Sequence, residues 1–144
     1  MEVKSKIEEQ AIAANKAARV LANVSTKVKN EALKAMAEAL CLCKNYILEE
    51  NKADMESARQ NGMSESMLDR LMLTEGRIEG MAEGLKQVAE LADPVGEVIA
   101  GRQLANGLSL TKIRVPLGVI AIIYEARPNV TADAIGLCLK SGNA

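Results

Sequence analysis

The sequence predicts an α/β fold: a helical first two thirds, then a β-hairpin arm, then the first strand–helix unit of a parallel sheet. Three observations favour this fold class. Apolar residues recur at spacings of three and four up to about Leu91, which is the period of an amphipathic helix. Two strand-like runs flank Asn106–Gly107, a dipeptide suited to a tight hairpin turn. Val119–Ile123 is continuously apolar, as expected for a strand that is covered on both faces in a parallel sheet.

The helical region is expected to begin with two long helices. In the first, small and apolar residues share one face, which would let a partner approach closely. They are Ile7, Ala11, Ala14, Ala18 and Leu21. Ser25 and Thr26 then offer an N-cap for a second, uninterrupted helix. Its apolar face consists of Leu33, Met36, Leu40, Cys43 and Ile47.

Two further helices complete this region. Asn61–Gly62 is typical of a helix end, and Ser64 of the next N-cap. A short helix is expected around Met67–Leu73. The fourth helix has one apolar face, made of Ile78, Met81, Leu85 and Val88.

Asp93–Pro94 ends the helical region, because proline cannot continue a helix and favours extended geometry in the residue before it. In the hairpin that follows, Gly96–Val115, the two faces of the second strand change polarity partway, which indicates either a bulge or a strand that leaves one environment and enters another. A hairpin of this length often reaches a neighbouring subunit. We therefore expect a homo-oligomer and place the segment boundaries at 1–93, 94–117 and 118–144.

Polar residues follow the predicted strand at the point where the last helix begins. The carboxyl ends of strands in open α/β sheets form the ligand crevice, and a helix N-terminus offers free N–H groups. Arg127 could therefore bind a phosphate or carboxylate, and Glu125 could accept from a ribose or an amine. Alternatively, Arg127 and Glu125 form a structural ion pair and Asn129 only caps the helix. The residues alone leave both interpretations open.

The end of the last helix suggests that more of the sheet follows. Lys140 suits a last turn, where the helix dipole favours a cation, and Gly142 suits the left-handed closing position. A second parallel strand should then begin at Ala144. A lone central strand leaves backbone groups unpaired, so we expect the sequence to be a piece of a longer protein.

Composition excludes several classes of function. The chain has 144 residues and a net charge of −1, with 18 basic and 19 acidic residues and almost no aromatic ones, so nucleic-acid binding is not expected. Without histidine, neither a Ser-His-Asp triad nor a histidine metal site can form. The longest apolar run is too short for a bilayer, and the N-terminus lacks the apolar region of a signal peptide. We expect a cytoplasmic protein that binds no metal and no membrane.

The three cysteines are expected to be reduced and structural. Cys43 lies on the apolar face of the second helix and Cys138 within the packed last helix, so both should be buried. Cys41 is turned off that face. Because apolar burial raises the pKa of a thiol, Cys43 and Cys138 are not expected to act as nucleophiles, and Cys41 lies in no motif that would make it one.

The strings PLGVI, YEARPNVT and CLKSGNA, between Pro116 and Ala144, closely resemble the γ-glutamyl phosphate reductase family, which belongs to the aldehyde dehydrogenase superfamily. Two upstream segments, Leu73–Val98 and Asn106–Gly118, agree in order and spacing. The resemblance covers essentially the whole chain and about the first third of the family's usual length.

The resemblance implies an aldehyde-dehydrogenase-like fold. In it, 1–93 is the helical N-terminal part of a cofactor domain, 94–117 an oligomerisation arm and 118–144 the start of a Rossmann-like NADP-binding domain. It implies a reductase that converts L-glutamyl 5-phosphate into glutamate 5-semialdehyde with NADPH, in proline biosynthesis. The catalytic cysteine of the family lies beyond residue 144, so this chain is expected to hold no catalytic residue and to be inactive by itself.

The resemblance also assigns site residues. Ile123, Tyr124, Glu125 and Ala126 match the segment that lines the cofactor cleft. Arg127 and Asn129 are the candidates for substrate binding, and Asn129 is also a candidate for holding the oxyanion.

Two other functions compete with that of a glutamyl phosphate reductase: a non-enzymatic helical assembly module, and an acylating dehydrogenase that uses a thioester of coenzyme A. The YEARPNVT string argues against the second of these.

Overall fold

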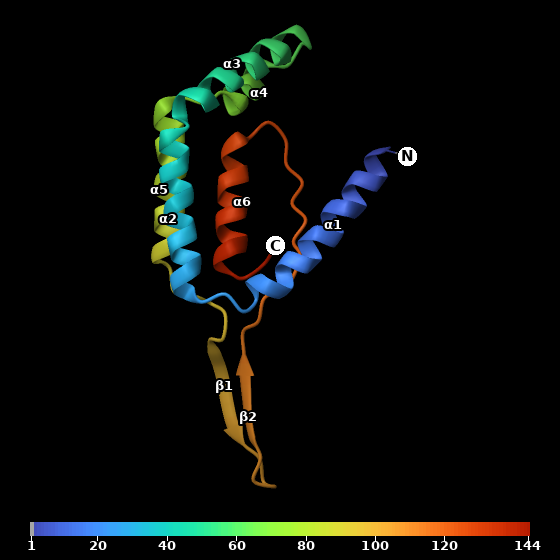
Figure 1. Cartoon of the computed structure of the whole chain (residues 1–144), viewed down its shortest axis with the longest axis vertical. Helices are drawn as coiled ribbons and strands as arrows, with labels where there is room; N and C mark the ends of the chain where they lie inside the picture. The colour runs from blue at the N-terminus through green and yellow to red at the C-terminus, as the bar shows by residue number, and fades with distance from the viewer. Residues whose placement is uncertain (1) are drawn as a thin grey trace.

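The structure is a computed structural model that describes residues 2–144, with side chains described from residue 6 onward. It is mostly helical, with one small antiparallel sheet of two strands. Figure 1 shows α2, α5 and α6 side by side, with α3 and α4 at one end, the hairpin projecting from the other end, and α1 pointing away. The elements are α1 (Glu2–Leu21), α2 (Thr26–Leu42), α3 (Lys44–Gln60), α4 (Glu65–Leu71), α5 (Glu75–Glu90), β1 (Val98–Gln103), β2 (Ser109–Ile113) and α6 (Pro128–Lys140).

The main core lies between α2, α5 and α6. Its fully buried members are small or branched aliphatic residues, namely Leu33, Ala37, Ala82, Leu85 and Ala89. Ile78 and Met81, two other residues of the predicted face on α5, are buried as well. At Gly136 of α6, an added Cβ would lie 2.7 Å from the side chain of Leu85. The three helices can therefore pack closely because small residues stand where they meet.

The prediction of one continuous second helix is wrong, because the chain bends at Cys43 and forms two helices there. Cys43 has φ −89° and ψ 8°, outside helical geometry, and α3 leaves α2 at an angle in Figure 1. The amide of Cys43 still donates to Ala39, and its carbonyl accepts from Ile47. Because the hydrogen bonds and the apolar spacing both continue through the bend, periodicity gave no sign of it.

A second cluster joins α3 and α4. It contains Met55, Ala58 and Leu68, with Met63 and Leu71 packed against it.

The expected helix caps are only partly present. The Ser25 side chain accepts from the amide of Val28, whereas the Ser64 side chain makes no capping bond.

Asn51 connects these two helices through the backbone. This side chain is buried; its amide nitrogen donates to the Leu71 carbonyl at 2.9 Å, and its oxygen accepts from the Leu73 amide at 2.7 Å. We expect Asn51→Ala to lower the free energy of unfolding by about 1–3 kcal/mol, since it leaves two backbone groups without their partner. Urea denaturation measures this loss, and Asn45→Ala, at an exposed position of α3, is the matched control. Equal effects of the two variants would contradict the role given to Asn51.

The hairpin and its turn are confirmed, since Gly107 adopts φ 84° between the strands. The bulge lies in the first strand and not in the second, because the register shifts between Val98 and Ala100. Every residue of β1 and β2 is exposed, among them the apolar Ile99, Leu110 and Ile113. The hairpin is therefore an arm that packs on nothing within the described residues.

The predicted strand at Val119–Ile123 is not formed. The segment is extended and open, and the Ile123 side chain is 99% exposed. One feature of a parallel pair is present, since the Ala144 amide donates to the Gly118 carbonyl at 2.9 Å and the Ile120 amide donates to the Ala144 carbonyl at 2.8 Å. These two bonds join Val119 and Ala144 in parallel register. No parallel sheet forms because the described chain brings no further strand against this segment.

The last helix begins at Pro128, with Arg127 as its N-cap, so the prediction of Asn129 as N-cap is wrong. Proline favours the first helical position, where it loses no hydrogen bond. The predicted end is confirmed: Gly142 follows the helix with φ 74°. Among the described helices, none is both long and apolar enough to cross a membrane.

Candidate functional site

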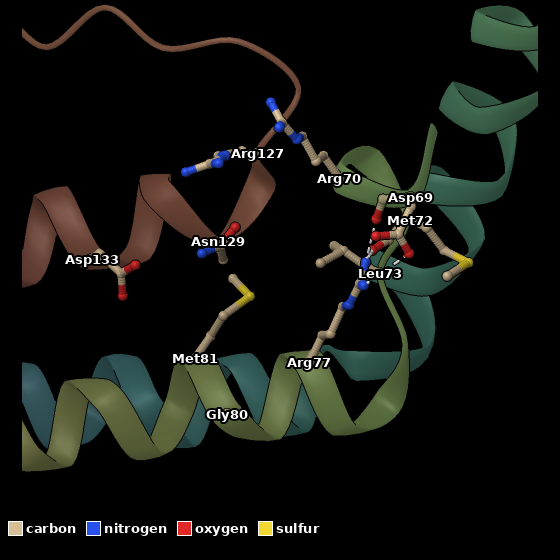
Figure 2. A pocket seen from close by; sticks show the side chains of 10 residues that line it. All are labelled: Asp69, Arg70, Met72, Leu73, Arg77, Gly80, Met81, Arg127, Asn129 and Asp133. Atoms are coloured by element: carbon tan, nitrogen blue, oxygen red, sulfur yellow. Dashed lines mark hydrogen bonds and ion pairs between the residues drawn. The ribbon is translucent and has the colours of Figure 1, made fainter. Parts of the chain in front are cut away.

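A pocket of about 450 Å³ lies between α4, α5 and the first turns of α6. It is formed by two stretches that are distant in sequence, 69–81 and 127–133, and Figure 2 shows their side chains. The lining residues are Asp69, Arg70, Met72, Leu73, Arg77, Gly80, Met81, Arg127, Asn129 and Asp133. Two of them, Arg127 and Asn129, are the predicted substrate-binding residues.

Arg77 has a structural role in the wall of this pocket. One of its guanidinium nitrogens lies 3.1 Å from the Asp69 carboxylate. Another donates to the carbonyl of Asp69 and, at 2.6 Å, to the carbonyl of Met72. Arg77 therefore satisfies the carbonyl end of α4 from the side, and its charge is already neutralised by Asp69.

Arg70 and Arg127 differ from Arg77 in this respect. Within the part of the chain that has described side chains, no ion pair joins either of them to an acidic group. Figure 2 shows Arg70 reaching from α4 towards Arg127 at the start of α6. The alternative Arg127–Glu125 ion pair is thus not formed. Two guanidinium groups that line one pocket without an ion-pair partner favour the binding of an anion there.

The first turns of α6 add polar groups to the same pocket. Asn129 lies in the first turn, where backbone N–H groups are free and the helix dipole is positive. Asp133 lies one turn further on and also lines the pocket. The α6 side of the pocket therefore presents Arg127, an amide and a carboxylate, while the α4 side presents Arg70.

The loop before α6 is held in an unusual conformation. Ala126 has φ 49°, which costs energy for a residue with a Cβ, and the Tyr124 hydroxyl lies 2.5 Å from the Thr131 hydroxyl of α6. This hydrogen bond ties the loop to the helix and so sets the direction in which Arg127 leaves it. Of the predicted cofactor residues Ile123, Tyr124, Glu125 and Ala126, none lines the pocket.

The cysteines lie away from this pocket. Cys43 and Cys41 are exposed and Cys138 is half-buried, so the predicted burial of Cys43 is wrong. Cys43 does lie on the predicted apolar face, beside Leu40 and Ile47, but this face lines an open groove that the described residues leave uncovered. No group of three or more potential metal ligands occurs in residues with described side chains.

Relatives of known identity cover this chain completely. It is 57% identical over 144 residues to γ-glutamyl phosphate reductase of Halothermothrix orenii and 56% identical to that of Clostridium novyi, in each case over 34% of the relative. The crystal structure of γ-glutamyl phosphate reductase from Thermotoga maritima matches with a TM-score of 0.91 and 46% identity, over 94% of this chain and 33% of that one. The Saccharomyces cerevisiae enzyme matches with a TM-score of 0.86 and 41% identity, over 91% of this chain and 33% of that one. No family model matches the chain.

The relatives and solved structures that the chain matches are reductases by name, and the chain spans about a third of their length. In sequence and in fold it corresponds to the N-terminal portion of γ-glutamyl phosphate reductases, which confirms the resemblance seen in its motifs. The comparisons give no support to a non-enzymatic assembly module.

Sequence reasoning missed Arg70 in the site. It stands in an ordinary helical string, Leu68-Asp69-Arg70-Leu71, and an exposed arginine on a helix has no distinguishing local pattern. Arg70 becomes a candidate only because it lines the same pocket as Arg127, and this depends on the packing of α4 on α3 and of α6 on α5.

Proposed function

We propose that the chain is the N-terminal portion of an NADPH-dependent reductase that converts L-glutamyl 5-phosphate into L-glutamate 5-semialdehyde in the cytoplasm, as a step of proline biosynthesis. The observation that carries this proposal is the 57% identity to γ-glutamyl phosphate reductase over all 144 residues. The names of these relatives refer to a glutamyl phosphate, which favours it over a substrate that carries coenzyme A.

The proposal extends to the organisation of the chain. Residues 1–93 form the helical N-terminal part of a cofactor domain of the aldehyde dehydrogenase type. Residues 94–117 form an oligomerisation arm, for which the complete exposure of β1 and β2 is the supporting observation. Residues 118–144 begin a Rossmann-like domain, supported by the parallel register of Val119 and Ala144.

The pocket provides groups suited to an acyl phosphate. A thiolate from the remainder of the protein adds to the acyl carbon, the bond to the phosphate oxygen breaks, and phosphate leaves with its electron pair. Asn129 is the candidate to donate a hydrogen bond to the carbonyl oxygen as it gains negative charge. Arg127 is the candidate to bind an anionic group of the substrate. The resulting thioester accepts a hydride, the thiolate departs, and the aldehyde is released.

The residues proposed for the cofactor form an open edge and no cavity of their own. Ile123 is fully exposed and Tyr124 is 45% exposed, so both offer a surface on which a ring could lie. This edge fits one wall of a nucleotide cleft whose other wall lies outside the described chain. NADPH, when bound there, would supply the hydride.

The cysteine assignment gives a direct test of this function. In the full-length protein, we expect glutamate 5-semialdehyde to be oxidised in the presence of phosphate, giving acyl phosphate, while NADP is reduced to NADPH. The reaction is followed by absorbance at the wavelength of the reduced nicotinamide. A variant with Cys41, Cys43 and Cys138 all replaced by serine should retain this activity, because none of the three lines the pocket. A wild-type protein without this activity would refute the proposed function. Loss of turnover in a well-folded triple variant would instead place the nucleophile in this chain.

A further inference from the structure

We propose that Arg70 binds the phosphoryl group of the substrate together with Arg127, so that the two side chains form a clamp for a doubly charged anion. This inference rests on the proposed function. It assigns a substrate-binding role to a residue of α4, a helix to which neither the motifs nor the comparisons give a function.

The first argument is that one pocket is lined by two cations without an ion-pair partner. Arg70 comes from α4 and Arg127 from the start of α6, and Figure 2 shows the Arg70 side chain reaching towards the loop at Arg127, while the Arg127 side chain extends along α6. Like charges brought together are unfavourable unless an anion lies between them. The carboxylate adjacent to Arg70 in sequence, Asp69, already pairs with Arg77 at 3.1 Å and is not available to relieve this repulsion.

The second argument is the fixed position of α4. Its C-terminal end is held from two sides, by Arg77 through the carbonyls of Asp69 and Met72 and by Asn51 through the carbonyl of Leu71. These bonds fix the backbone on either side of Arg70. A binding group on a fixed backbone loses less conformational freedom when it takes up its ligand, which favours a binding role over that of a freely solvated side chain.

The third argument selects the phosphoryl group over the substrate's carboxylate. A phosphate monoester carries a charge of about −1.5 to −2 at neutral pH and has three acceptor oxygens. It can neutralise two guanidinium groups and accept two hydrogen bonds from each. A carboxylate carries one charge and is saturated by a single bidentate arginine. Two unpaired arginines therefore match the phosphoryl group better.

The experiment uses the full-length protein in the oxidative direction, in which aldehyde, phosphate and NADP give acyl phosphate, NADPH and a proton. Phosphate is then a separate reactant with its own kinetic constants. In Arg70→Gln we expect kcat/KM for phosphate to fall about 10- to 100-fold, the loss typical of a hydrogen bond to a charged group, while KM for the aldehyde stays unchanged. Arg127→Gln should behave alike, and Arg70→Lys should lie in between because a lysine keeps the charge but not the fork of donors.

Arg59→Gln, at an exposed arginine in the last turn of α3, is the matched control and should leave all constants unchanged. An active wild type whose kcat/KM for phosphate is the same in Arg70→Gln would overturn this inference and leave the proposed function standing. A rise in KM for the aldehyde alone would also overturn it, since Arg70 would then bind the substrate's carboxylate. An inactive wild type would refute the proposed function itself.

Discussion

Lys29→Ala is expected to lower the free energy of unfolding by about 3–5 kcal/mol, because it leaves a carboxylate in a buried site without its cation. The Lys29 ammonium is 1% exposed and lies 2.5 Å from the carboxylate of Asp93, whose side chain is 11% exposed. The same ammonium donates to the carbonyl of Lys140, the last residue of α6, at 3.2 Å. One side chain thus joins α2 to the start of the hairpin arm and to the end of α6.

Urea denaturation followed by circular dichroism measures this effect. Lys27→Ala is the matched control: Lys27 is 83% exposed and lies 3.9 Å from Glu31, so its loss should cost about 0–1 kcal/mol. A loss for Lys29→Ala no larger than that of the control would show that the buried pair contributes nothing to stability.

The same pair predicts a loss of stability in acid. Partial burial alone would raise the pKa of Asp93, but hydrogen bonds from Lys29, Thr26 and the Val95 amide outweigh it and lower the pKa below its ordinary value. A carboxyl group whose pKa is lower in the folded state contributes stability above its unfolded pKa and loses it as the pH falls through the folded pKa. Stability should therefore decline below about pH 4, and less steeply in Asp93→Asn.

Gly142→Ala should lower the free energy of unfolding by about 2–5 kcal/mol, the sum of a backbone and a packing cost. Gly142 has φ 74°, a conformation unfavourable to any residue with a Cβ. An added Cβ would also lie 2.9 Å from the Pro116 ring and 3.3 Å from the Val95 side chain. These contacts are close because Gly142 turns the chain from α6 back beside the base of the arm.

Gly107→Ala separates the two costs. Gly107 has φ 84°, but an added Cβ would meet no atom within 4 Å. This control should lose only the backbone part, about 1–2 kcal/mol. Thermal or urea denaturation of both variants gives the comparison. An equal loss of unfolding free energy in the two variants would mean that small movements relieve the crowding around Gly142, so that it does not contribute to the destabilisation.

The candidate site was predictable only in part. Arg127 and Asn129 could be found because they follow an apolar segment and open a helix, a local pattern that marks ligand sites in α/β proteins. Arg70 could not be found, because its place in the pocket depends on the packing of α4 on α3 and of α6 on α5. The alternative ion pair of Arg127 with Glu125 also looked reasonable locally. The structure turns Arg127 into the pocket instead.

The amino-acid sequence by itself determined the helices, their apolar faces, the hairpin with its Gly107 turn and the glycine end of α6. These features depend on residues a few positions apart, and their spacing and backbone preferences can be read from a short stretch of sequence. Tertiary structure alone decided the bend at Cys43, the open state of Val119–Ile123 and the presence of Arg70 and Arg127 in one pocket. Each of these depends on which distant segment lies alongside, and neither periodicity nor capping carries that information.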